Sequence, residues 1–411
     1  MAALALLFIF FLAMLSFLGW LYILLHPARP WDFLPVGDDG PIPDLAAVVV
    51  LPPVCVIVPA RNEAESLPGT LPALLKQDYP AEFRVILVDD RSADGTADVA
   101  RKLAAELGAS ERLTVLQGKP LPEGWTGKVW ALDQGAKEAA ETHAEFVLLT
   151  DADILHAPQS LRRLVAESLA AGIGMNSRMA RLRCESPAEH LLIPAFVYFF
   201  NLLYPMRRVN DPRDALAGAA GGCVLLSAEA LRRLDGGFES IKSEIIDDVN
   251  LARQVKRSGL PLFLALSRTE VASLRDYPHL DDIWKMVRRT AFTELKYSWA
   301  RLFGAVAGLT LMFVVPVFAI LAGLGAFIAT SDPQIHAYAV MTFGKGLLSV
   351  LLMRFVYSPA VRFFKLPARW AWTLPAAAVL YGLMTIDSAL RHARKARTEW
   401  REVAGTHPLK S

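Results

Sequence analysis

The two ends of the chain carry long apolar segments. Residues Ala2 to Leu25 contain no charged side chain. At ~1.5 Å per residue, a helix of this length crosses the ~30 Å hydrocarbon layer of a bilayer. A cleaved signal peptide is the alternative. However, no basic residue precedes the segment, it is longer than a signal core, and HPARPWDF follows it in place of a small-residue cleavage site. We therefore expect a retained transmembrane anchor over residues 1–26.

The last third of the chain contains three further apolar segments. Leu302 to Ala329 carries no charge, Val340 to Tyr357 includes two basic residues, and Trp370 to Ile386 ends before the basic run RHARKAR. A proline inside the first segment is compatible with a membrane helix. We expect a transmembrane region of two to three helices over residues 300–390 and a basic tail over 391–411.

Basic side chains beside these segments predict the orientation. Because Lys and Arg loops stay on the cytoplasmic side of a membrane, they place residues 30–300 in the cytoplasm, in a multi-pass protein of the inner or plasma membrane. The basic residues concerned are Arg29, Arg288, Arg289, Lys296 and Arg301. Four full spans would then put the basic tail outside. Either the Val340–Tyr357 segment does not cross the membrane or the tail departs from the rule, and the sequence leaves both open.

Short apolar segments alternate with helical ones in the middle of the chain. VCVIVPA (54–60), FRVILVDD (83–90), LTVLQG (113–118) and EFVLLTDAD (145–153) have the pattern of strands. Alternation of strands and helices at this spacing predicts an α/β domain with a mostly parallel sheet. Such a sheet binds its ligands beyond the carboxyl ends of the strands.

Three of the predicted strands end in polar residues: Arg61, Asn62 and Glu63; Asp89 and Asp90; Asp151 and Asp153. One such end is ordinary, because the chain is entering a loop. Together they gather carboxylates at one edge of the sheet, where a divalent cation would relieve their repulsion. In D-x-D the two carboxylates share one side of an extended chain, and their hard oxygens suit Mg²⁺ or Mn²⁺. His156 could add a further ligand, although we expect a surface or helix-capping histidine.

Composition and charge exclude some partners. The hydrophobic fraction is 54% and the net charge is +2. No basic run is interleaved with aromatic residues, so nothing indicates a nucleic-acid partner. The three cysteines are far apart and lack zinc spacing, which fits a reducing compartment.

The apolar segment His190–Pro205 is too short to span a membrane and fits an interfacial helix and a buried core helix equally well.

The motifs between residues 54 and 292 resemble those of the inverting glycosyltransferases of family 2, which have the GT-A nucleotide-sugar fold. VIVPARNEAESL, LVDDRSADGT, GKVWALDQG, LLTDADI, AGGCVLLS and IIDDVNLA stand in that family's order. The resemblance implies a cytoplasmic GT-A domain over residues 50–292, flanked by N- and C-terminal transmembrane helices. It also implies a nucleotide-diphosphate sugar, which we expect to be a UDP-sugar, and Mg²⁺ or Mn²⁺ as cofactor.

The resemblance assigns roles to the predicted site. Asp90 would accept a hydrogen bond from the base, Asp151 would face the ribose and the metal, and Asp153 would ligate the metal. The residues expected to line the nucleotide pocket are Pro59, Ala60, Asn62 and Glu63. Lys128 would lie near the donor phosphates, although a lysine at a helix start is also commonly just solvated.

Inverting transfer also needs a base. A carboxylate takes the proton of the acceptor hydroxyl during displacement at the anomeric carbon. The resemblance favours Asp248, with Asp247 beside it in place of the family's more usual Glu. Carboxylates at a helix start are otherwise often caps. The glycines Gly221 and Gly222 either form a tight turn into a strand or let the backbone approach an acceptor.

One departure from the family concerns its processive members. Their Q-x-x-R-W signature reads Lys285, Met, Val, Arg288, Arg289 here. The absent Trp argues against a growing polysaccharide, whereas Arg288 and Arg289 suit a diphosphate or lipid headgroups. The stretch PLPEGWTGKVWAL makes the chain most similar to the hopanoid-biosynthesis-associated glycosyltransferases, and somewhat similar to ceramide glucosyltransferases.

These observations predict an enzyme that moves one sugar to a membrane lipid, of hopanoid type or another polycyclic or sphingoid lipid. The alternative enzyme is a processive exopolysaccharide synthase. A catalytically inactive scaffold is disfavoured by the intact acidic set of Asp90, Asp151, Asp153 and Asp248. A transporter is disfavoured because the long apolar segments are few, and Leu302–Ala329 holds no ionisable residue.

Overall fold

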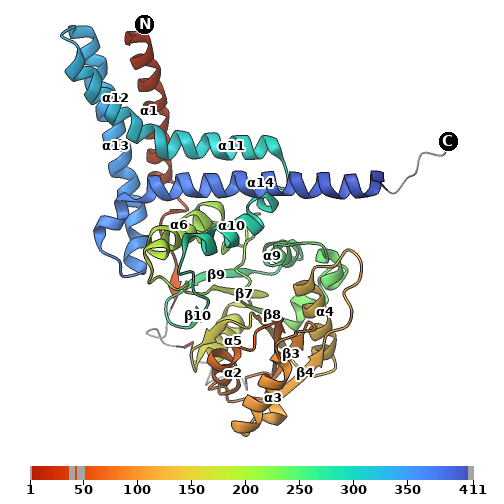
Figure 1. Ribbon diagram of the computed structural model, residues 1–411. Coiled ribbons are helices and arrows are strands. Elements are labelled where there is room, and N and C mark those ends of the chain that lie inside the picture. Colours follow the sequence, from red (N-terminus) through yellow and green to blue (C-terminus); the bar gives the residue numbers. More distant parts are fainter. Residues whose placement is uncertain (1, 37–41, 44–50, 406–411) are drawn as a thin grey trace, which may run out of the picture. The chain divides into compact units, whose positions relative to one another are not determined.

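The computed structural model describes residues 2–36, 42–43 and 51–405, and the chain divides into two compact units. The helical unit comprises residues 1–32, 184–200 and 277–411, and the sheet unit comprises residues 33–183 and 201–276. Figure 1 shows both units coloured along the sequence. Residues 184–200 and 277–292 lie within the domain predicted over 50–292 and cluster by contacts with the helical unit.

In the described part of the sheet unit, eight strands form one sheet in the order β1-β9-β7-β8-β5-β2-β3-β4. Every neighbouring pair is parallel except the two that β8 makes with β5 and β7. The strands are β1 (Pro35–Val36), β2 (Val54–Ala60), β3 (Phe83–Asp89), β4 (Leu113–Gln117), β5 (Phe146–Thr150), β7 (Met175–Met179), β8 (Cys223–Ser227) and β9 (Leu262–Ser267). The predicted mostly parallel α/β sheet is therefore confirmed.

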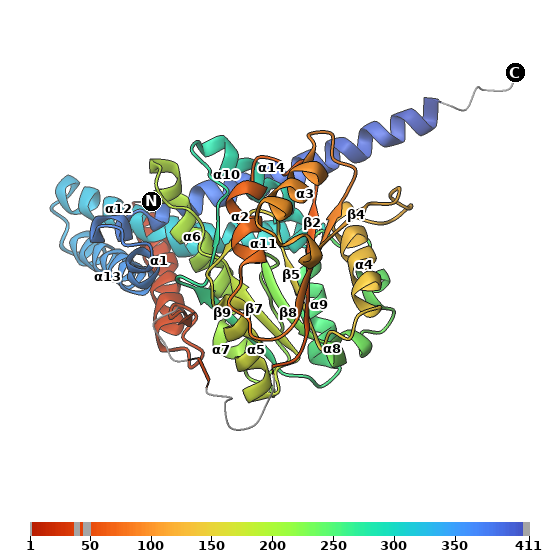
Figure 2. The same ribbon diagram turned by 90° about the horizontal axis from the view of Figure 1, so that it is seen from below.

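Helices cover both faces of this sheet. Successive side chains of a strand point to opposite faces, so the apolar side chains on each face need a covering layer. Val54, Val56 and Val58 pack with α2, α3 and α5 in the main hydrophobic core, whereas a side chain at Gly135 of α4 would overlap Ile57 of β2. Figure 2 shows α2 and α5 on one side of the strands and α4 and α9 on the other. These helices are α2 (Leu67–Leu75), α3 (Thr96–Glu106), α4 (Gly127–Ala140), α5 (Ser160–Ala171) and α9 (Asp247–Arg257).

Short elements complete the sheet unit. β6 (Ile154–His156) and β10 (Val271–Ser273) form a separate antiparallel pair. The remaining short helices are η1 (Ser110–Arg112), α7 (Met206–Val209), α8 (Ala228–Arg232) and η2 (Gly237–Ile241). The pairing of β6 with β10 brings residues 271–273 beside the chain that has just left β5.

The helical unit combines three contacting apolar helices with helices that run across them (Figure 1). Its elements are α1 (Ala2–Leu25), most of α6 (Pro187–Leu203), α10 (Leu280–Glu294), α11 (Trp299–Leu309), η3 (Thr310–Val314), α12 (Val315–Ala329), α13 (Pro333–Phe363), η4 (Ala368–Trp372) and α14 (Leu374–Gly405). Large apolar side chains are exposed on α1, α12 and α13, among them Phe8, Leu321 and Phe355. Exposed apolar surface of this kind suits lipid.

The turn between α11 and α12 is held by α1. η3 is a single π-helical stretch next to Pro316, and such stretches leave backbone groups without their helical partner. The carbonyl of Met312 accepts hydrogen bonds from Trp20 Nε1 at 2.8 Å and Ser16 Oγ at 3.3 Å. A side chain at Gly19 would overlap Met312. Close helix packing at a small residue is typical of membrane bundles.

Within the described residues, three helices are long and apolar enough to cross a membrane: Ala3–Leu25, Trp299–Ala329 and Pro333–Phe363. They correspond to the predicted anchor and the first two C-terminal segments. The third segment forms the start of α14, which is not among them. The predicted basic tail is helical as far as Gly405, and residues 406–411 lie outside the described part.

The segment His190–Pro205 forms most of α6, whose residues 187–200 pack among the helices of the helical unit. Phe199 contacts Phe313 and Tyr381, with ring centroids 5.6 and 5.3 Å apart. Tyr198 and Ile193 are fully buried. Of the two readings that the sequence left open, these contacts favour the buried helix.

Candidate functional site

The carboxyl ends of three parallel strands bring most of the predicted donor residues to one edge of the sheet. β2 leads into Arg61, Asn62 and Glu63, β3 into Asp90, and β5 into Asp151. The α4 helix starts close to this edge, because a side chain at Gly127 would lie 2.9 Å from Asp90 Oδ2. The site therefore lies where open α/β sheets bind ligands.

A lysine and three aspartates meet at the centre of this edge. Lys128 Nζ lies 2.8 Å from Asp151 Oδ1 and 3.8 Å from Asp247 Oδ2. Asp247 and Asp248 form the first turn of α9. These side chains line a small cavity with Pro59, Leu132, Leu149, Thr150, Gly221, Val224 and Leu251. The cation of Lys128, at the start of α4, thus lies among carboxylates from two other elements, the end of β5 and the start of α9.

Burial and the charges of this cluster bring the pKa of Asp248 close to neutral pH. Burial raises the pKa of Asp248 to about 7, with a further contribution from the charge of Asp247, while Lys128 opposes the shift. Burial alone would lower the pKa of Lys128, but the charges of Asp151 and Asp247 outweigh it and raise that pKa. Lys128 therefore stays charged while Asp248 can gain and lose a proton.

Asp248 does not act as a conventional helix cap. Its Oδ1 accepts a hydrogen bond from the adjacent Val249 N–H at 2.8 Å, whereas the N-cap position of α9 is occupied by Ile246, which makes no side-chain capping bond. Gly221 closes the opposite side, because a Cβ there would lie 3.3 Å from both Asp248 Oδ2 and Lys128 Nζ. A Cβ at Gly222 would lie 3.2 Å from Ile154. Gly221 thus borders the site closely, whereas Gly222 packs against Ile154 and does not line the cavity.

Asp90 has an acceptor atom that the described residues leave unused. Its side chain is 8% exposed, and Oδ2 pairs with Arg61 Nη1 at 3.2 Å. Oδ1 is buried and accepts no hydrogen bond, the guanidinium of Arg91 lying 3.8 Å away. A buried carboxylate oxygen without a donor is costly, so this atom fits the predicted contact with a nucleotide base.

Asn62 and Glu63 hold the loop after β2. Asn62 is left-handed with φ 56°, and its Oδ1 accepts a hydrogen bond from Ala93 N–H at 2.9 Å. The Glu63 N–H donates to Thr96 Oγ1 at 2.9 Å, and its carboxylate faces Arg275 at 3.4 Å. An asparagine at positive φ usually marks a tight or functional turn. These bonds order the loop.

The D-x-D segment forms a turn and not the extended chain that was predicted for it. β5 ends at Thr150, and Ile154 N–H bonds to Asp151 C=O at 3.2 Å, so residues 151–153 form a turn. Alternation in an extended strand is therefore the wrong explanation for the pair. Asp151 contacts Lys128, whereas Asp153 Oδ2 contacts Ser273 Oγ and Arg275 Nε, each at 3.2 Å.

The two aspartates remain close enough to affect each other. Burial raises the pKa of Asp153, Arg275 opposes this shift, and the charge of Asp151 adds to it. No group of three His, Cys, Asp or Glu side chains is arranged for a metal within the described residues. Mg²⁺ is nevertheless commonly held by one or two carboxylates and the phosphates of a substrate. The carboxylates of Asp151 and Asp153, two positions apart on one turn, fit that arrangement.

His156 is neither a surface residue nor a cap, contrary to our expectation. It is 2% exposed, its Nε2 lies 2.8 Å from Thr150 Oγ1, and its Nδ1 lies 3.2 Å from Ser160 Oγ. Burial lowers the pKa of His156 to about 4. It is thus a neutral core histidine that supports the turn from inside.

Arg288 and Arg289 belong to α10 of the helical unit. Arg288 Nη1 lies 3.3 Å from Asp387 Oδ2, which also accepts a hydrogen bond from Trp284 Nε1 at 2.8 Å. Arg289 is exposed. Lys285, at the position of the processive enzymes' Gln, pairs with Asp281 within its own helix.

Comparison with known families decides the assignment of the chain. The profile described as "Glycosyltransferase like family 2" matches residues 52–298, more than half of the chain. The chain belongs to this family of glycosyltransferases. Together with the mostly parallel sheet, the membership establishes the predicted GT-A fold.

Curated relatives match this glycosyltransferase over part of its length. It is 36% identical over 126 residues to an undecaprenyl-phosphate mannosyltransferase from Micrococcus luteus, covering 30% of the chain and 48% of that protein. It is 27% identical over 216 residues to a 4,4'-diaponeurosporenoate glycosyltransferase from Staphylococcus haemolyticus, covering 51% and 53%. The chain thus spans about half the length of these relatives.

Among solved structures, a mannosyltransferase from Pyrobaculum calidifontis, in complex with GDP-Man and Mn²⁺, covers 94% of this chain and 98% of its own. The identity is 18% and the TM-score 0.46.

Two residues of the candidate site carry no signal in the local sequence. Arg275 and Ser273 contact Asp153 from 120 or more positions away. No short motif surrounds them, and only the pairing of β10 with β6 brings them there. Arg61 follows β2 directly and had the signal of a polar strand end, but its pairing with Asp90 needed the fold.

Proposed function

We propose that this glycosyltransferase moves a single sugar, with inversion, from a nucleotide-diphosphate sugar to a membrane lipid. The observation that carries the proposal is the shared cluster of Lys128, Asp151, Asp247 and Asp248 at the carboxyl edge of the sheet. It combines a fixed cation for a leaving diphosphate with a carboxylate that titrates near neutral pH.

In this reaction Asp248 accepts the proton of the acceptor hydroxyl as that oxygen attacks the anomeric carbon. The bond from the anomeric carbon to the diphosphate oxygen breaks, and the diphosphate leaves with the electron pair. The charge of Lys128 stabilises the leaving group. Asp90 Oδ1 binds the base of the donor, and the loop through Asn62 and Glu63 forms the wall of the nucleotide pocket.

Asp151 and Asp153 would hold Mg²⁺ or Mn²⁺ together with the donor phosphates. The cation supplies charge stabilisation for the leaving diphosphate when it is bound. This role rests on the oxygen donors at the turn after β5. We propose UDP as the nucleotide.

The acceptor is proposed to be a lipid, because two relatives are named for undecaprenyl phosphate and for 4,4'-diaponeurosporenoate. The described residues also include three helices long and apolar enough to cross a membrane. We propose a hopanoid-type, other polycyclic or sphingoid lipid that offers a hydroxyl. A lipid phosphate already carries an anionic oxygen near neutral pH and needs no base. A base at Asp248 is therefore required only for a hydroxyl acceptor, and the choice of acceptor separates the two cases.

The test incubates membranes containing the full chain with labelled UDP- and GDP-sugars, Mn²⁺ and a panel of lipids, followed by lipid extraction. The panel includes a polycyclic alcohol, a ceramide and undecaprenyl phosphate. We expect label in extractable lipid carrying one sugar, and none with Asp153→Ala. Label confined to insoluble polymer would support the processive synthase instead, and the absence of any label with a folded protein would support an inactive scaffold.

A further inference from the structure

Arg275 is a cation bound to the candidate metal ligand. Its Nε lies 3.2 Å from Asp153 Oδ2, and its Nη2 lies 3.4 Å from Glu63 Oε1. The two carboxylates are 13% and 17% exposed, whereas the Arg275 side chain is 46% exposed. One guanidinium thus neutralises two largely buried carboxylates and still faces solvent.

The backbone that carries Arg275 is fixed to the D-x-D turn. β10 pairs with β6, and Leu274 N–H donates to the Asp153 carbonyl at 2.9 Å. Ser273 Oγ donates to Asp153 Oδ2 at 3.2 Å. The guanidinium is therefore presented to Asp153 by a short, hydrogen-bonded segment.

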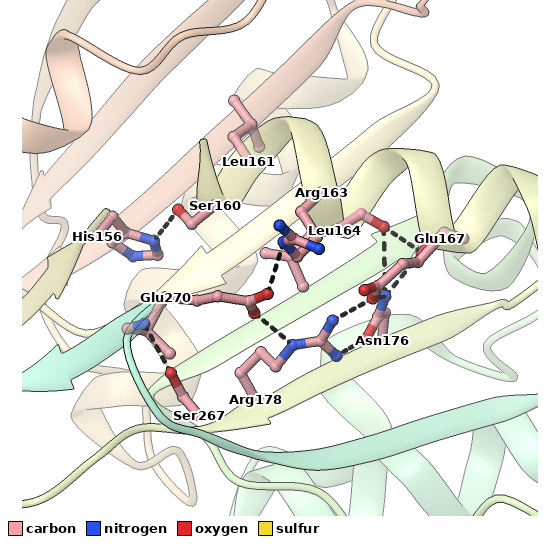
Figure 3. A network of polar contacts seen from close by, with 12 residues as sticks. His156, Ser160, Leu161, Arg163, Leu164, Glu167, Asn176, Arg178, Ser267 and Glu270 are labelled. Atoms are coloured by element: carbon pink, nitrogen blue, oxygen red, sulfur yellow. Dashed lines mark hydrogen bonds and ion pairs between the residues drawn. The ribbon is translucent and has the colours of Figure 1, made fainter. Parts of the chain in front are cut away.

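A buried charge network anchors the same segment from the other end. Glu270, directly before β10, is 1% exposed and pairs with Arg178 and Arg163, each at 2.9 Å. Figure 3 shows Glu270 pointing between these two arginines, which come from β7 and α5. The Val271 N–H donates to Ser267 Oγ at 2.8 Å. Both flanks of the segment are thus held in place by hydrogen bonds and ion pairs within the protein.

Two cations cannot share one carboxylate oxygen at close range without repulsion. A divalent ion at Asp153 Oδ2 would therefore compete with Arg275, and a displaced guanidinium needs a new anionic partner. Its planar fork matches phosphate oxygens and can bind two of them at once. The donor's diphosphate supplies such oxygens.

We propose that Arg275 is a resident counter-cation of this site, displaced from Asp153 by a divalent metal and then bound by the diphosphate of the donor. This inference rests on the proposed metal role of Asp153. It explains how two acidic residues stay neutralised without metal, and it couples metal binding to donor binding through one side chain.

The first test measures Mn²⁺ binding to the full chain in detergent, without nucleotide, from the EPR signal of free Mn²⁺. Arg275→Gln is expected to bind Mn²⁺ about threefold to tenfold more tightly than the wild type, because a competing ion pair of this partly exposed kind is lost. Arg275→Lys keeps the charge and should shift the affinity less in the same direction. Arg183→Gln is the matched control, since Arg183 pairs with Asp276 at 3.5 Å and has similar exposure; it should bind Mn²⁺ like the wild type.

The second test measures UDP and GDP binding at saturating Mn²⁺. Arg275→Gln should weaken binding of the preferred nucleotide about tenfold, the loss of a charge-assisted phosphate contact. Binding of the corresponding nucleoside, which has no phosphate, should not change. A merely structural role for Arg275 would weaken nucleoside and nucleotide alike.

Mn²⁺ affinity that stays equal or falls in Arg275→Gln, with an unchanged unfolding temperature, overturns the proposal. If the Gln variant does not fold, the same comparison is made with Arg275→Lys. Asp153→Ala separates the two levels of inference. If it leaves Mn²⁺ binding unchanged, the proposed metal role of Asp153 fails. If it removes Mn²⁺ binding while Arg275→Gln behaves like the wild type, only the role of Arg275 fails.

Discussion

At the scale of single residues, the site depends on how four charges share a small space. Lys128 faces Asp151 and Asp247 directly, and Asp248 sits beside them with a pKa of about 7. A base works best when its pKa is near the operating pH. Asp248 meets that condition because of burial and the like charge of Asp247, and neither cause is visible in the dipeptide itself.

Replacing the proposed base should separate chemistry from binding. Asp248→Asn should lower kcat by about 10²- to 10⁴-fold, the usual contribution of a positioned base. Nucleotide affinity, measured by calorimetry, should stay close to that of the wild type, because Asn keeps the shape of Asp. Substantial residual turnover with a hydroxyl acceptor would rule out this role.

The pH profile tests the same group. Because Asp248 must be deprotonated to accept a proton, kcat/KM should fall as the pH drops through about 7. Asp247→Asn removes a charge that raises this pKa, so the acidic limb should move to lower pH. Asp98→Asn, at an exposed position on α3, removes the same charge elsewhere and should leave the limb unmoved. If the acidic limb stays at the same pH in Asp247→Asn, a group other than Asp248 is responsible for it.

At the scale of elements, the β6–β10 pair and the network behind it position the turn after β5. Arg178 of β7 is fully buried and paired with Glu270 and Glu167. Figure 3 shows Asn176 completing the contacts of Arg178. A buried pair of this kind adds little stability compared with apolar packing, but losing one partner leaves an uncompensated charge.

Glu270→Ala should therefore destabilise the chain strongly. The free energy of unfolding should fall by about 3–5 kcal/mol, because Arg178 and Arg163 lose a shared buried partner. A urea titration of the full chain in detergent measures this. Glu229→Ala removes the carboxylate of the exposed Glu229–Arg233 pair and should cost less than about 1 kcal/mol. Equal effects of the two substitutions would contradict the importance of the buried network.

At the scale of the whole molecule, the number of spans sets the sides of the membrane. Of the three candidate spans in the described residues, two lie between the sheet unit and α14, so the sheet unit and the chain after α13 would lie on the same side. The basic tail then obeys the positive-inside rule together with Arg29 and Arg301. Four spans would have put the basic tail outside. That conflict does not arise with three spans, because the third C-terminal segment begins α14, which is not a candidate span.

Cysteine labelling in whole cells checks this topology. With Cys184 replaced by Ser, a membrane-impermeant maleimide should label Ser331→Cys, between α12 and α13, in intact cells. Arg391→Cys in α14 and Glu229→Cys in the sheet unit should react only after permeabilisation. Cys55 and Cys223 are buried and should not react with the maleimide. Labelling of Arg391→Cys in intact cells would indicate an even number of spans.

The sequence by itself determined the parts that depend on local pattern. β2, β3 and β4 lie within a residue of their predicted bounds, because apolar runs of that length between turn residues have few alternatives. The acidic strand ends indicated that these side chains gather at one edge of the sheet, since parallel strands all end on one side. The three membrane-length helices follow from length and hydropathy alone.

Tertiary structure decided which distant side chains meet. The contact of Arg275 with Asp153, the burial of His156 and the packing of α6 all join residues whose local sequence has no motif for it. The pKa of Asp248 likewise depends on burial and on charges brought in by α4 and α9. A local pattern records how a segment alternates between apolar and polar faces, but burial and charge pairing depend on what the fold packs against that segment.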